Sequence, residues 1–318
     1  MKRISVLLLL FLSLLLFFSC ATSIPVQMTV PPKMDYQGAR SVGVLPFSSS
    51  SEDAAQISRG LNSYFSWYQR RTLTSELKLA AYISSKVEST LASTDFFKVI
   101  SSAQLQDQVA AGNLAVDAIV TGKLTSVQDD QTDEYTEKTD SNGVVTGVIT
   151  YTRTSKISVT FTILSATDLS ILDTIDAVQE AKSVSTDYSS LDSYETLQYE
   201  AADEILEQVK YQLIPRTYTE YRTMEKLAND KDPRVEKIDQ LIDGGFYQDA
   251  YDLYMDIYRE TSDWAALYNS ILLVEVMGDY DRAIEEMTQL AKDSGNKKAV
   301  SQMNRMIQQK QNREAMAN

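Results

Sequence analysis

The chain has 318 residues, and its 44 acidic and 30 basic side chains give it a net charge of −14. This balance excludes proteins that bind nucleic acid through clustered Lys and Arg. The chain has no histidine and a single cysteine, which excludes Ser-His-Asp and Cys-His catalysis, the common zinc sites and an intramolecular disulfide. Its length suggests about two domains.

The first twenty residues predict a membrane address. Two basic residues precede a stretch that is almost entirely apolar over residues 6–18, which is shorter than the roughly 20 residues that span a bilayer. Ser19 and the lone Cys20 follow. The pattern resembles a bacterial lipoprotein signal, which implies removal of residues 1–19 and lipidation of Cys20. Ala21 stands where the inner-membrane retention signal of such lipoproteins has Asp, so the resemblance implies an outer-membrane lipoprotein that faces the periplasm.

Residues 20–40 predict a lipidated tether. Pro25, Pro31 and Pro32 favour an extended chain, and the segment has few large apolar residues. We therefore expect it to lift the folded domains off the lipid surface.

Residues 41–214 predict an α+β domain. Strands are expected at 41–47, 96–100 and 118–127, with helices beginning at Thr74 and spanning 102–110. Asn142-Gly143 predicts a hairpin in which both residues have positive φ. Strict alternation over 157–163, a strand at 171–184 and a long helix that ends near Pro215 complete the pattern. This order indicates a mixed sheet packed with helices.

Three segments carry a family resemblance. They are SVGVLPF at 41–47, FFKVI at 96–100 and DAIVTG at 117–122. In this order they resemble the CsgG and LpoB group of envelope lipoproteins. The resemblance implies a periplasm-facing α+β domain that contacts other envelope proteins. CsgG forms a secretion pore with membrane-spanning hairpins, but the hairpin candidate here, at 129–142, has many carboxylates, which disfavours a lipid-facing surface.

Residues 215–318 predict an all-helical domain with an internal repeat. GFYQDA at 245–250 returns as GDYDRA at 278–283, 33 residues later. The pattern resembles the tetratricopeptide repeat, although Glu275 stands where that family usually has an aromatic residue. The resemblance implies helical hairpins with a concave partner-binding face. We expect this face to be lined by Tyr247, Tyr251, Tyr254, Tyr268 and Asn269, and the alternative is that these residues pack between helices.

A second contact surface is predicted where Tyr64, Phe65, Trp67 and Tyr68 cluster just before two arginines. Aromatic and Arg residues dominate the energetics of protein interfaces, so Trp67 and Tyr68 are partner-binding candidates. The alternative is that the rings cover the sheet edge.

These features predict a non-enzymatic, membrane-anchored envelope lipoprotein that acts as a protein–protein interaction scaffold or assembly factor. We expect no catalytic residue, metal or cofactor. The expected partners are envelope proteins or peptides, the membrane through the lipid, and further copies of the chain. Two alternatives stay open, a subunit of a CsgG-like secretion channel and a cell-wall enzyme that works with carboxylates alone.

Overall fold

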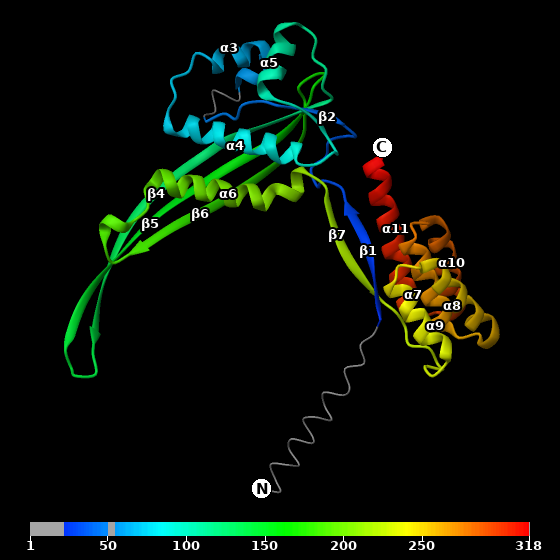
Figure 1. Ribbon diagram of the computed structural model, residues 1–318. Helices are drawn as coiled ribbons and strands as arrows, with labels where there is room; N and C mark the ends of the chain where they lie inside the picture. Colours follow the sequence, from blue (N-terminus) through cyan, green and yellow to red (C-terminus); the bar gives the residue numbers. More distant parts are fainter. Residues whose placement is uncertain (1–21, 50–54, 318) are drawn as a thin grey trace. The chain divides into compact units, whose positions relative to one another are not determined.

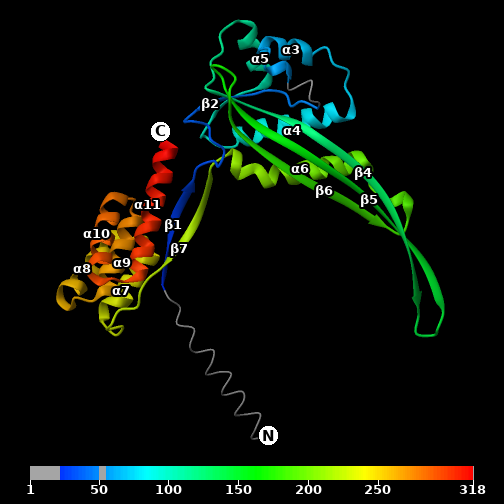
Figure 2. The same ribbon diagram turned by 180° about the vertical axis from the view of Figure 1, so that it is seen from behind.

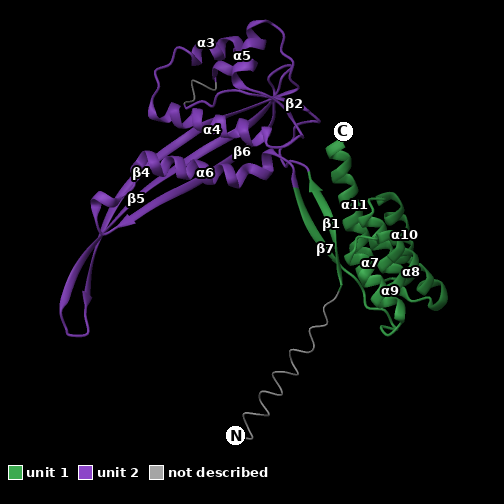
Figure 3. Ribbon diagram, in the orientation of Figure 1, with its two compact units in different colours: residues 1–30, 217–317 green, residues 31–216, 318 purple. Residues whose placement is uncertain are grey.

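The computed structural model describes residues 22–49 and 55–317. They form two compact units, coloured separately in Figure 3. Unit 1 comprises residues 22–30 and 217–317, and unit 2 comprises residues 31–216. The predicted signal peptide and Cys20 lie outside the described residues. No helix in the described ranges is both long enough and apolar enough to cross a membrane.

Unit 2 contains a five-stranded mixed sheet in the order β3-β2-β4-β5-β6. β2 pairs in parallel with β3 and β4, whereas β4–β5 and β5–β6 are antiparallel. The sheet confirms the predicted mixed architecture. The strands are β2 (Ser41–Val44), β3 (Lys98–Ile100), β4 (Ala118–Thr139), β5 (Val145–Ser165) and β6 (Ile171–Ser185).

Helices pack on both faces of this sheet. The longer α4 (Ser75–Ala92) and α6 (Tyr194–Leu213) share one apolar core with the alternating residues of β5, including Val159 and Phe161. The shorter α3 (Leu61–Tyr68) and α5 (Ser102–Ala110) share a second core, which includes Leu45 and Ile119. Because successive strand residues point to opposite faces, the two cores lie on opposite sides of the sheet.

Local sequence signals explain where these helices begin. The Thr74 side chain accepts a hydrogen bond from Leu77 N at the start of α4, as predicted. Ser101 and Gln104 form a reciprocal capping box before α5, and Ser193 caps α6. Each cap satisfies backbone donors that the first helical turn leaves unpaired.

β4 and β5 are far longer than the sequence predicts. They stay paired from Ala118↔Ser165 out to Thr139↔Val145, whereas β6 stops pairing with β5 at Tyr151↔Ser185. Residues 134–150 therefore form a two-stranded extension beyond the sheet, which we call the distal hairpin, and Figures 1 and 2 show it running past the end of β6. The sequence predicts a hairpin turn at Asn142-Gly143 but ends the preceding strand at residue 127, because Asp and Glu have low strand propensity. In the structure these carboxylate residues pair with the Thr-rich β5.

The turn of the distal hairpin differs from the prediction. Only Gly143 has a positive φ, at 81°, so the expected pair of positive-φ residues is wrong. Asp140 shapes the loop, because its Oδ1 accepts hydrogen bonds from Asn142 N and Val144 N, each at 2.9 Å. The loop is thus a longer type that needs glycine at one position.

Unit 1 contains five helices among the described residues: α7 (Pro233–Asp243), α8 (Tyr247–Thr261), α9 (Trp264–Val276), α10 (Tyr280–Ser294) and α11 (Lys297–Ala317). The 33-residue repeat corresponds to two identical turns. Gly245 N and Gly278 N bond to carbonyls three residues back, both with positive φ. The residues after them bond five residues back, and the fully buried Ala250 and Ala283 follow. The helical C-terminal region is as predicted, with two hairpins built alike.

Two strands belong to unit 1 as well, and both correct the sequence prediction. β1 (Ser23–Val30) pairs with β7 (Arg216–Thr223) in a two-stranded sheet, which we call the ribbon. Met224 N bonds to Thr22 O, and Gln27 Nε2 bonds to Thr219 Oγ1, so the strands run antiparallel. Residues 23–30 are therefore a strand instead of a tether, and the segment after 215 is not all-helical.

Candidate partner-binding surfaces

The helical face expected to receive a partner is covered by the ribbon of the same chain. Ile24 of β1 is fully buried in a core shared with Ile238 of α7 and Ile271 of α9. Thr22 Oγ1 donates to Asp239 Oδ1 at 3.1 Å, and Gln309 of α11 donates to Gln27 O, also at 3.1 Å. The ribbon thus contacts α7, α9 and α11, which are alternate helices of the array.

A buried ion pair locks β7 onto this face. Arg222 reaches Glu275 through two hydrogen bonds, Nη2 to Oε1 at 3.1 Å and Nε to Oε2 at 3.3 Å. Gln302 Nε2 donates to the same carboxylate at 2.8 Å, and Glu220 Oε2 lies 2.8 Å from Arg222 Nη1. Burial raises the pKa of Glu275 above its ordinary value, and the hydrogen bonds from Arg222 and Gln302 oppose that shift. Glu275 therefore connects β7 to the helices α9 and α11 through these contacts.

Asn269 is a structural residue. Its side chain is fully buried, Oδ1 accepts from Glu225 N, and Nδ2 donates to Glu225 O, both at 2.7 Å. The prediction that it lines an open groove is wrong, because the amide is consumed by the segment that follows β7. The partner of Asn269 could not be read from the sequence, because Glu225 lies 44 residues away in the chain.

The four tyrosines predicted with it are also mainly packing residues. Tyr254 and Tyr268 are buried, and Tyr268 stacks on Trp264 with ring centroids 5.1 Å apart. Tyr247 and Tyr251 are half-buried against the same core. The Tyr251 hydroxyl accepts a short hydrogen bond from Arg282, whose guanidinium lies 4.8 Å from its ring. These tyrosines therefore pack between helices, as the alternative interpretation of the sequence expects.

The aromatic cluster on α3 is divided between core and surface. Tyr64 is fully buried and its hydroxyl donates to Pro46 O at 2.5 Å. Trp67 and Tyr68 are half-buried and flank the Tyr64 ring at 5.9 and 6.1 Å. The guanidinium of Arg71 lies 4.6 Å from the Trp67 ring. These contacts assign much of the cluster to packing on the sheet.

The distal hairpin is a surface that the sequence interpretation missed. It exposes four large apolar side chains: Tyr135 (61% exposed), Val144 (57%), Val145 (56%) and Ile149 (41%). Neither of its strands has a partner beyond the other in the described part of the chain. Exposed apolar residues next to unpaired backbone edges are the features that β-strand addition uses.

Three carboxylates meet at a surface cavity of about 400 Å³ lined by α4, β4 and α6. Two of them, Glu76 and Glu195, lie in the first turns of α4 and α6, where a negative charge stabilises the helix dipole. The third, Asp129, accepts hydrogen bonds from Ser155 Oγ at 2.7 Å and Gln198 Nε2 at 3.0 Å. All three therefore have structural explanations. Within residues 22–49 and 55–317, no cluster of three or more ligating side chains could hold a metal.

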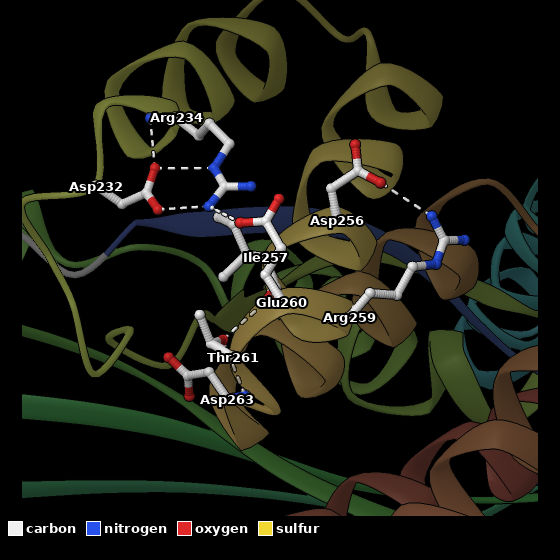
Figure 4. Close-up of polar contacts among 8 residues, drawn as sticks. All are labelled: Asp232, Arg234, Asp256, Ile257, Arg259, Glu260, Thr261 and Asp263. Carbon is white, nitrogen blue, oxygen red and sulfur yellow. Dashed lines mark hydrogen bonds and ion pairs between the residues drawn. The ribbon is translucent and has the colours of Figure 1, made fainter.

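Figure 4 shows the polar contacts that join the ends of α7 and α8. Asp232 caps α7 and accepts two hydrogen bonds from the Arg234 guanidinium, at 2.9 and 2.7 Å. The same guanidinium pairs with Glu260 of α8 at 2.8 Å. Hydrogen bonds from Arg234 lower the pKa of Asp232 to about 2. This is a surface clamp within the helical array.

Comparisons with known proteins give distant likenesses. No protein-family model matches the chain, and no curated protein matches it. Among solved structures, it is similar to a PelC dodecamer from Paraburkholderia phytofirmans, with 11% identity, 61% of this chain and 98% of that chain covered, and a TM-score of 0.28. It is also similar to the hypothetical protein CT253 from Chlamydia trachomatis (12% identity, 55% and 98% covered, TM-score 0.26).

A third similar structure is lipoprotein GNA1162 from Neisseria meningitidis, with 12% identity, 54% of this chain and 97% of that chain covered, and a TM-score of 0.20. At these TM-scores the likenesses carry no argument about function.

Proposed function

We propose that the protein is an envelope lipoprotein, anchored through Cys20, that serves as a protein–protein interaction scaffold or assembly factor. The anchor rests on the lipoprotein-like signal at residues 1–20. The observation that carries the scaffold role is the distal hairpin, a two-stranded extension with exposed apolar side chains. The same proposal assigns residues 41–214 to a CsgG/LpoB-like domain and residues 215–318 to a tetratricopeptide-like domain. It also places the protein in the outer membrane.

The distal hairpin replaces the helical face as the proposed partner site. The helical face is filled by β1 and β7, so a peptide would have to displace buried residues such as Ile24 and Arg222. The hairpin requires no displacement. Lipid anchoring raises the effective concentration of the protein near other envelope proteins, so weak contacts at this surface are sufficient.

In-cell photocrosslinking tests the scaffold role. A photoreactive residue replaces Tyr135, which is 61% exposed. We expect a discrete crosslinked product, and we expect the triple variant V144T/V145T/I149T to lose it while its thermal unfolding is unchanged. The matched control is V178T/V184T, because those valines are also exposed, at 46 and 52%, but lie on β6 outside the hairpin.

The outcomes separate the proposed functions. A crosslink that survives the triple variant, or the absence of any crosslink, would overturn the hairpin as the partner site. A product that is a ladder of the chain's own multiples, together with a stable ring in detergent, would favour the secretion-channel subunit. The variant C20S tests the anchor, since it should release the protein from membranes.

A further inference from the structure

The strand β1 begins close to the proposed lipid attachment. Cys20 precedes Thr22 by two residues, and a chain extends by at most about 3.6 Å per residue. Thr22 is already part of the folded unit, because its carbonyl accepts a hydrogen bond from Met224 N and its hydroxyl donates to Asp239. The covalent connection between lipid and fold is therefore at most about 7 Å long.

The ribbon that follows is fixed to the helices. Ile24 is completely buried, and Val26 and Met28 are only 2 and 6% exposed. β1 is therefore held by core packing along its length. A pull or tilt at the anchor is transmitted to the helical array instead of being absorbed by a linker.

α11 runs along the ribbon and gives it a direction. Near its start, Lys298 Nζ lies 2.7 Å from Glu225 Oε1, one residue beyond the Met224–Thr22 hydrogen bond. Further along, Gln309 bonds to Gln27 O, deeper into β1. The first turn of α11 thus lies at the same end of unit 1 as Thr22, and its last turns lie toward the other end.

We infer that the end of unit 1 that carries Thr22 and the first turn of α11 is held against the lipid headgroups. This inference rests on the proposed lipidation of Cys20. It replaces a domain that floats on a proline-rich tether with a helical unit set directly on the membrane, and it gives the bilayer surface as the partner of this end of the fold.

Two single-cysteine labels test the inference in the full chain, purified with its lipid and reconstituted in vesicles. The thiol of Cys20 is used by the lipid, so a fluorophore attaches only at an introduced cysteine. K297C places it in the first turn of α11, and Q311C places it 14 residues further on, about 21 Å along the helix. Both native side chains are exposed.

Nitroxide-labelled headgroups are expected to quench the K297C label at least two-fold more than the Q311C label. A ten-residue Gly-Ser insertion after Ala21 is the matched control, since it precedes β1 and adds a flexible reach of about 18 Å. We expect it to reduce the quenching of the K297C label by at least half.

Each result decides the matter. Mass spectrometry first shows whether Cys20 carries lipid, and an unmodified Cys20 would overturn both the proposed anchor and this inference. With Cys20 lipidated, equal quenching at the two positions, or no effect of the insertion, would overturn the inference alone and leave the proposed function standing.

Discussion

Among the described residues, the ribbon and the distal hairpin are both antiparallel strand pairs, but their surroundings are opposite. β1–β7 lies on a helical array and buries Ile24 and Arg222, whereas the distal hairpin of β4 and β5 exposes Tyr135 and Val145. An isolated two-stranded hairpin is only marginally stable in water. The ribbon is stabilised by the helices that it packs on, and the distal hairpin is stabilised because its strands continue into the five-stranded sheet. Similar strand pairs are therefore part of the core in one unit and exposed surface in the other.

The largest expected effect removes the carboxylate that holds the buried ribbon. Glu275→Ala leaves Arg222 buried with only Glu220 as an acidic partner, so we expect unit 1 to lose about 3–5 kcal/mol of unfolding free energy. Urea unfolding measures this when followed by Trp264 fluorescence in a Trp67→Phe background, because each unit has one tryptophan.

The double variant R222M/E275L is the control for that experiment, since it removes both charges and retains apolar volume. It should be closer to the parent than Glu275→Ala. If Glu275→Ala unfolds like the parent, the ion pair does not hold the ribbon.

A matched pair of valines sharpens the comparison directly. Val26→Thr places a hydroxyl in a side-chain position that is 2% exposed and should destabilise unit 1 by about 1–3 kcal/mol. Val145→Thr makes the same change at a position that is 56% exposed and should alter stability by less than about 0.5 kcal/mol. If the two variants shift the urea midpoint equally, the ribbon and the distal hairpin do not differ in burial.

The amide of Asn269 tests the segment that continues from the ribbon. Asn269→Ala leaves Glu225 N and O without their side-chain partner, and we expect a loss of about 1–2 kcal/mol. Asn304→Ala, at an exposed position on α11, serves as the control and should have little effect. Similar losses in both variants would argue against a specific role for Asn269.

The smallest effect concerns the surface clamp of Figure 4. The pKa of Asp232 is lowered from 3.8 to about 2, so its pairing with Arg234 stabilises the fold above pH 4 and is lost as the pH falls through about 2. The difference in stability between the parent and Asp232→Asn should therefore shrink from pH 5 to pH 2. A difference that stays constant over this range would exclude the charge as its source.

The sequence alone determined the features that depend on local chemistry. Thr74 and Ser101 mark helix starts through their side-chain oxygens, and the alternation of β5 marks its buried face. The repeated glycines of unit 1 mark equivalent turns, because the positive φ there favours glycine over every other residue. These signals gave the mixed sheet, its helices and the helical C-terminal region.

Only the tertiary structure decided which surfaces are free. β1 has the period-two pattern of a strand in Ile24, Val26 and Met28. Its partner β7 is far away in the sequence, since Gln27 and Thr219 are 192 residues apart, beyond the reach of any local pattern. Once the two strands pair, they cover the helical face that the sequence predicts to bind a partner. This is why the proposed partner site lies on the distal hairpin, where no third strand pairs in the described chain.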